Sequence, residues 1–159
     1  MKIYHFVTGQ LLPIGINEAW DFFSSAKNLA LITPPELHFK ILTELPEAEV
    51  YEGMIIDYKV KPLLGIQVQW RTEICAVDKP VLFTDRQLKG PYRLWEHTHT
   101  FTAEKNGVWM RDSVKYQLPL GFIGTIAHSL VVRNKIREIF SYRKAVLDKM
   151  FNNDENLND

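Results

Sequence analysis

The segment between Gly65 and Leu118 alternates apolar and polar residues with the two-residue period of β-strands. In its first strand the alternating set is Ile66, Val68, Trp70, Thr72 and Ile74. Farther along, a set with two aromatic residues also carries two histidines: Trp95, His97, His99 and Phe101. Buried polar groups cost free energy unless they are paired, so this mixture indicates a polar network or a pocket. The pattern therefore predicts an antiparallel sheet with ionisable side chains on its inner face.

Two neighbouring strands continue the same mixture of apolar and polar inward positions. Their inward residues are Phe83, Asp85 and Gln87 on one strand and Asp112, Val114 and Tyr116 on the other. Asp85 and Asp112 thus share the inner face with the two histidines.

Three predicted turns set the pairing of these strands. Asn106-Gly107 favours a two-residue type I′ loop, because both residues tolerate positive φ. That loop pairs Lys105 with Val108 and places Phe101 opposite Asp112, His99 opposite Val114 and His97 opposite Tyr116.

The other two turns agree on which face is inside. An Asp78-Lys79 turn before Pro80 pairs Ile74 with Phe83, Thr72 with Asp85 and Trp70 with Gln87. A three-residue connection, Gly90-Pro91-Tyr92, places Asp85 opposite His97. Because a slip of one residue swaps the faces of a strand, this agreement supports the inward set.

Composition limits the class of protein. The 159 residues fit one domain with a sizeable core, and the 19 basic and 19 acidic residues balance. The chain has no basic tail that would favour binding to nucleic acid. The single Cys75 excludes an internal disulfide, and no apolar run is long enough to span a bilayer. The first residues lack the pattern of a signal peptide. We expect a soluble, cytoplasmic monomer or homodimer with no nucleic-acid partner and no integral membrane association.

The remaining elements follow from periodicity and breakers. We expect a strand at 2–12, a helix at 18–25 capped by Asn17, a helical continuation at 26–32, and strands at 38–44 and 53–60. Apolar residues at helical spacing predict a long helix from Ile123 to Phe151. A single domain would span 1–151, followed by a frayed polar tail at 152–159.

This order of elements resembles the helix-grip fold of the START-like (SRPBCC) superfamily. Within it, the sequence is similar to a bacterial polyketide cyclase/dehydrase-like subgroup, which is also found fused to epimerase-like domains of cell-division inhibitor proteins. The similar segments are 28–35, 83–87, 90–92, 95–101 and 139–143, and Asp112 with 116–121. The resemblance implies an α+β fold with a curved antiparallel sheet of about seven strands around the terminal helix. It also implies a ligand cavity between the sheet and that helix.

The histidine pair has three possible roles. His97 and His99 project from one face of a strand, where Asp85 or Asp112 could complete a two-histidine, one-carboxylate metal site. In the predicted register, however, Asp85 faces His97 and Asp112 lies diagonal to His99, so each histidine has a carboxylate partner. We therefore favour a structural or ligand-orienting network over general acid–base catalysis, and both over a metal. We expect no cofactor.

Two further features have simpler explanations. The basic residues Arg133, Lys135, Arg137, Arg143 and Lys144 would form the solvated face of the terminal helix. Cys75 falls on the outer face by parity, and we assign it no catalytic role.

The sequence thus favours a domain that binds a small, mainly apolar or amphipathic molecule, without catalysis. A cyclase, dehydratase or hydrolase with Asp–His acid–base pairs is the first alternative, and a protein-interaction module is the second. Candidate catalytic residues are His97, His99, Asp85 and Asp112. The candidate ligand-binding residues are Val68, Trp70, Thr72, Phe83, Asp85, Gln87, Trp95, His97, His99, Phe101, Asp112, Val114 and Tyr116.

Overall fold

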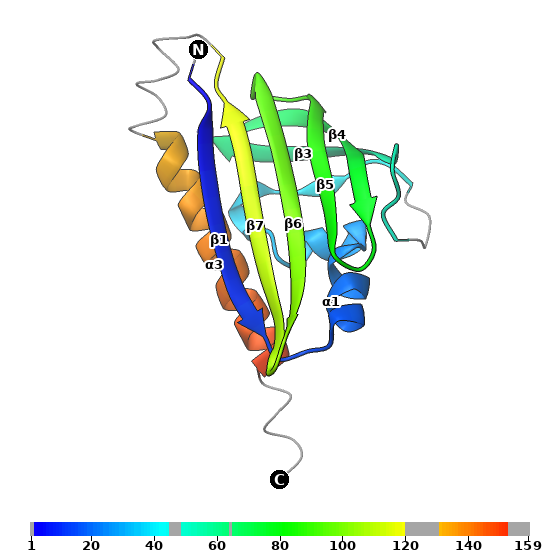
Figure 1. The fold of residues 1–159 in the computed structure, drawn as a ribbon. Helices are drawn as coiled ribbons and strands as arrows, with labels where there is room; N and C mark the ends of the chain where they lie inside the picture. The colour runs from blue at the N-terminus through cyan, green and yellow to red at the C-terminus, as the bar shows by residue number, and fades with distance from the viewer. Residues whose placement is uncertain (1, 45–48, 64, 120–130, 153–159) are drawn as a thin grey trace.

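The protein forms one curved antiparallel sheet with helices α1 and α3 on the same side of it (Figure 1). The computed structural model describes residues 2–44, 49–63, 65–119 and 131–152. The elements in chain order are β1 (Tyr4–Leu12), α1 (Ile16–Phe23), the 3₁₀ helices η1 (Ala26–Ala30) and η2 (Pro35–Leu37), β2 (Lys40–Ile41), β3 (Ile55–Leu63), β4 (Ile66–Asp78), β5 (Leu82–Lys89), β6 (Leu94–Glu104), β7 (Gly107–Gln117) and α3 (Arg133–Asn152).

The strand order is β1-β7-β6-β5-β4-β3-β2, so β2 to β7 form a meander that β1 closes at one edge. This confirms the predicted architecture of about seven strands, short helical segments after the first strand and a long terminal helix. The predicted start of that helix at Ile123 lies outside the described residues. So does the tail predicted at 152–159, except for Asn152, which belongs to α3 instead. No helix among the described residues is both long and apolar enough to cross a membrane.

Several predicted boundaries are corrected. The helix α1 begins at Ile16, and Gly15 rather than Asn17 occupies its N-cap position. The expected helical continuation at 26–32 is only the 3₁₀ turn η1. The strand expected at 38–44 is limited to β2, and it starts late because His38 ends η2 with a left-handed φ of 46° that a strand cannot contain. The strand expected at 53–60 is β3, which begins and ends later.

The predicted register between β6 and β7 is wrong by two residues. The loop consists of Lys105 and Asn106, so Glu104 rather than Lys105 closes the hairpin, and it pairs with Gly107. Consequently His99 lies opposite Asp112, His97 opposite Val114, Trp95 opposite Tyr116 and Phe101 opposite Met110. A shift of two residues keeps every side chain on its predicted face, which is why the inward set survives.

The predicted register between β4 and β5 is also wrong. The connection includes Val81 as well as Lys79 and Pro80, and a β-bulge interrupts the pairing between Ile74 and Ala76. Ile74 therefore lies opposite Asp85 instead of Phe83, Thr72 lies opposite Gln87 instead of Asp85, and Trp70 does not pair with Gln87. The predicted register between β5 and β6 is confirmed, since Asp85 lies opposite His97.

Two clusters of buried side chains hold the helices on the sheet. The fully buried Trp20 of α1 lies edge-on to Phe83 and Phe101, with ring centroids 5.9 and 6.1 Å away. Phe140 of α3 packs on Phe6 of β1 at 5.0 Å. Each buried aromatic of this kind contributes on the order of 2–3 kcal/mol. These contacts fix both helices over the inner face of the sheet.

We expect Gly107→Ala to lower the free energy of unfolding by about 2 kcal/mol or more. Gly107 has a φ of 140°, and a Cβ there would overlap the carbonyl oxygen of Leu12. Gly53→Ala is the matched control, because its φ of 85° is also positive but nothing lies within 4 Å of the added Cβ, so its loss should be about 1 kcal/mol. Urea denaturation measures both. Equal losses would show that the close approach to Leu12 does not constrain the hairpin.

Candidate functional site

A cavity of about 180 Å³ lies between the inner face of the sheet and α3. The sheet and its adjoining loops give it a largely aromatic wall of Phe39, Tyr58, Trp70, Phe83, Tyr92 and Trp95. The helices contribute Phe22, Phe23, Ala26, Leu29, Ile136, Ile139 and Phe140. Four ionisable side chains of the lining, Asp85, His97, His99 and Arg143, are linked by ion pairs in which Asp112 takes part, and Lys135 also lines the cavity.

The predicted site residues divide into two groups. Seven of them line the cavity: Trp70, Thr72, Phe83, Asp85, Trp95, His97 and His99. The others lie outside its lining. Phe101 and Val114 belong to the buried clusters, as does Tyr116, while Val68 packs against one of them. Gln87 hydrogen-bonds the backbone N–H and carbonyl of Tyr92, and Asp112 contacts the two histidines.

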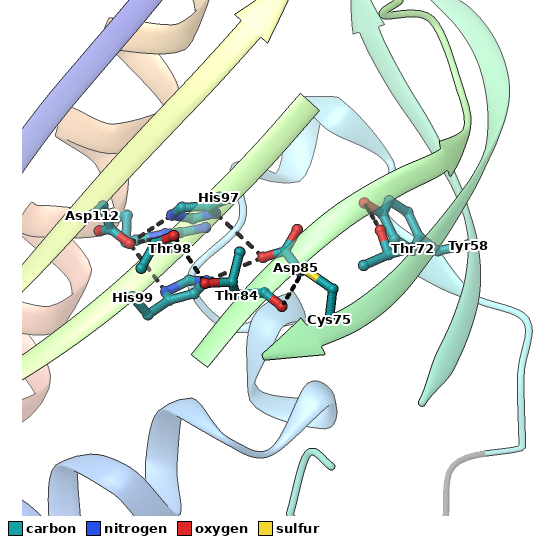
Figure 2. Close-up of polar contacts among 10 residues, drawn as sticks. Tyr58, Thr72, Cys75, Thr84, Asp85, His97, Thr98, His99 and Asp112 are labelled. Atoms are coloured by element: carbon teal, nitrogen blue, oxygen red, sulfur yellow. Dashed lines mark hydrogen bonds and ion pairs between the residues drawn. The ribbon is translucent and has the colours of Figure 1, made fainter. Parts of the chain in front are cut away.

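Asp85, His97, His99 and Asp112 form one contiguous cluster across β5, β6 and β7 (Figure 2). Nε2 of His97 donates to Oδ1 of Asp112 at 2.8 Å, and Nε2 of His99 hydrogen-bonds Oδ2 of Asp85 at 3.3 Å. The other two ring nitrogens are also close to carboxylates. Nδ1 of His97 lies 3.6 Å from Asp85, and Nδ1 of His99 lies 3.1 Å from Asp112 without hydrogen-bond geometry.

The strand register explains this double pairing. Each histidine has one aspartate directly opposite, Asp85 for His97 and Asp112 for His99, and the other aspartate on the diagonal. Both hydrogen bonds follow the diagonals, which long side chains on one face of a sheet can span. The two imidazole rings therefore lie between two carboxylates, tilted by 39° to one another with centroids 3.9 Å apart.

Burial and charge give the cluster members different pKa values. Burial opposes ionisation of Asp112, but the hydrogen bond from His97, the nearby imidazole of His99 and the charge of Arg143 outweigh it and hold the carboxyl pKa well below its usual range. Burial and the neighbouring His99 lower the pKa of His97 despite its bond to Asp112. For His99, burial is outweighed by Asp112 and Asp85, and the pKa is raised.

Three members of the cluster could hold a metal ion. Ligand atoms of Asp85, His97 and His99 all lie within 4.8 Å of one another. Every ring nitrogen, however, already has a carboxylate oxygen within 3.6 Å. A hydrogen-bonded network accounts for this geometry, and the expectation of no resident metal stays a prediction.

Arg143 was missed by the sequence analysis and corrects it. Its side chain does not lie on the solvated face of the helix: the residue is 7% exposed and lines the cavity. It occupies the same helical stripe as the buried Ile136, Phe140 and Leu147. That spacing of three and four residues is the signal that could have found it. Arg133, Arg137 and Lys144 are exposed as expected, whereas Lys135 is partly buried at the cavity wall.

Cys75 lies beside the bulge of β4, and its thiol is 3.5 Å from the carbonyl oxygen of Thr84 (Figure 2). Burial raises the pKa of this thiol, which disfavours the nucleophilic thiolate. This agrees with assigning Cys75 no catalytic role.

No protein-family model and no curated protein matches the sequence. Solved structures do match. Ginseng major latex-like protein 151 from Panax ginseng has a TM-score of 0.67 at 10% identity, covering 94% of this chain and 97% of that chain. The di-domain ARO/CYC StfQ of the steffimycin biosynthetic pathway has a TM-score of 0.62 at 11% identity, covering 93% and 52%. A nucleoside-diphosphate sugar epimerase from Corynebacterium glutamicum has a TM-score of 0.59 at 22% identity, covering 91% and 28%.

These similarities establish the helix-grip fold for this chain. They agree with the START-like architecture that its sequence resembles, including likeness to part of a cyclase and part of an epimerase. At such low identities the likeness defines the fold and leaves the activity to the site itself.

We expect the imidazole of His99 to titrate above the ordinary value of 6.5 and that of His97 below it. His99 stabilises the fold fully at pH values below the pKa that its imidazole has in the unfolded chain. This stabilisation is lost as pH rises through the raised pKa of the folded state. His97 behaves in the opposite way. Its contribution is complete at pH values above the pKa of the unfolded chain and is lost as pH falls to the lowered pKa of the folded state. Histidine titration by NMR measures both, and Asp112→Asn should lower the pKa of His99. Titration of both rings below 6.5 in the unmodified protein would contradict the pairing.

Proposed function

We propose that the protein binds a small, mainly apolar molecule in the cavity between the sheet and α3. Asp85, His97 and His99 would orient the polar part of that molecule. The observation that carries the proposal is a preformed hollow with aromatic and aliphatic walls and a few ionisable groups, of which Asp85, His97 and His99 belong to one cluster. This combination is characteristic of small-molecule sites, in which apolar walls supply affinity and a few polar groups supply orientation.

The size of the cavity supports a ligand of one or two rings. A dry apolar cavity of about 150 Å³ in an engineered protein holds benzene. The cavity here, at about 180 Å³, is somewhat larger. Its wall includes Trp70 and Trp95, whose rings meet edge-on at 5.4 Å, together with Tyr92. Flat aromatic surfaces of this kind favour contact with a flat ligand.

General acid–base catalysis is the second candidate function. Asp85 and His99 are hydrogen-bonded and both face the cavity, so the pair could move a proton to or from a bound molecule. Likeness of the fold to part of the ARO/CYC StfQ is compatible with this chemistry. A binder would retain its ligand unchanged, whereas an enzyme would release a product at a rate that depends on His99. The open cavity gives less support to an interaction module.

We expect 2-naphthalenemethanol, a neutral two-ring probe, to bind with one-to-one stoichiometry and Ala26→Trp to abolish the binding. Ala26 lines the cavity, and an indole there would occupy part of its volume. Isothermal titration calorimetry measures the binding. Ala30→Trp is the matched control, because Ala30 belongs to the same short helix but is exposed and outside the lining.

Binding in the control with loss in Ala26→Trp would support the cavity as the site. Failure of the unmodified protein to bind the probe, or equal binding by all three proteins, would contradict the proposal.

A further inference from the structure

The guanidinium of Arg143 has donors that no group in the described part of the chain accepts. Arg143 lines the cavity, and its Nε and Nη1 atoms are buried without a hydrogen-bond partner. A guanidinium offers five N–H donors and no acceptor, so it can be satisfied only by acceptor atoms. Leaving such donors buried and unpaired is unfavourable, which makes this the polar group of the cavity most in need of a partner.

Asp112 does not fill that need. Its Oδ1 lies 3.6 Å from Nη1 of Arg143, a distance that gives charge attraction without a hydrogen bond. The same oxygen already accepts from His97 at 2.8 Å and lies 3.1 Å from Nδ1 of His99. Asp112 thus balances part of the charge of Arg143 and leaves its donors available.

The second cation at the cavity wall is already paired. Nζ of Lys135 lies 3.3 Å from Glu138 and 4.0 Å from Glu36, and its side chain is 27% exposed. Water can satisfy its remaining donors. Arg143 therefore differs from Lys135 in being deeply buried, in having unmet donors and in lying beside the histidine cluster.

The cavity has a further buried donor without a partner. Nε1 of Trp70 is buried, belongs to a cavity-lining residue and makes no hydrogen bond. Indole, like guanidinium, can only donate. Asp85 and Asp112 oppose a further negative charge, but the raised pKa of His99 favours a second positive charge beside Arg143.

We propose that the ligand of this cavity is a flat apolar acid and that Arg143 binds its carboxylate. This inference rests on the proposed function of ligand binding and adds the chemical class of the ligand. A carboxylate consists only of acceptors, and its two oxygens match the planar fork of a guanidinium. The apolar body would lie against Phe83, Trp70 and Trp95 in the same cavity.

A matched pair of probes tests the proposal. 2-Naphthoate and 2-naphthalenemethanol share the same rings and differ in the carboxylate. Calorimetry at pH 7 should show about tenfold or greater preference of the unmodified protein for 2-naphthoate, the effect of a charge-assisted hydrogen bond. Arg143→Met should remove this preference and leave the affinity for the alcohol within about threefold, because Met keeps much of the apolar volume.

Arg137→Met is the control, since Arg137 is exposed on the same helix and should change neither affinity. Arg143→Lys should keep part of the preference, because it retains the charge and loses the fork.

The outcomes separate this inference from the function on which it rests. If the protein binds the alcohol and shows no preference for 2-naphthoate, the proposal that the ligand carries a carboxylate is overturned, while the proposed binding function still holds. A preference that persists in Arg143→Met overturns the role of Arg143. Binding of neither probe by the unmodified protein overturns both proposals, and this comparison needs no variant to fold.

Discussion

The carboxylate of Asp112, 4% exposed, brings together three side chains that the rest of the site depends on. It accepts a hydrogen bond from His97, lies 3.1 Å from His99 and attracts Arg143 from α3 across the cavity wall. A buried charge is tolerated only when it is paired, so these contacts require β6, β7 and α3 to keep their relative positions. One residue thereby couples the sheet, the terminal helix and the polar part of the cavity.

The sheet and the helix contribute unlike parts of the site. The sheet places Asp85, His97 and His99 on adjacent strands, where each ring nitrogen lies within 3.6 Å of a carboxylate oxygen. The helix adds Arg143, whose donors remain unmet. Histidines held between carboxylates, next to a cation with unmet donors, suit a site that holds its own geometry before a ligand arrives. Such preorganisation limits the ordering that binding requires.

The sequence predicted the faces of the strands far better than their pairing. Side-chain alternation has a period of two, so His97, His99, Asp85 and Asp112 could be assigned to the inner face without knowing any turn. The register between β6 and β7 failed because Gly107 is needed for its approach to Leu12, a contact between segments far apart in the sequence. The prediction that Arg143 lies on the solvated face of the helix failed for another reason. The helical spacing of Arg143 indicates burial, whereas its charge favours exposure to solvent. The nearby carboxylate of Asp112 is what makes its burial favourable.

The most direct test of this account is the response of the histidine ring nitrogens to a ligand, followed by ¹⁵N NMR during titration with 2-naphthoate. If the Asp–His cluster and Arg143 form the polar part of the binding cavity, the signals of His97 and His99 should shift together as the site fills. The exposed His5 and His38 should remain unchanged. Saturable binding that leaves the His97 and His99 signals in place, or shifts those of His5 and His38 equally, would contradict the account.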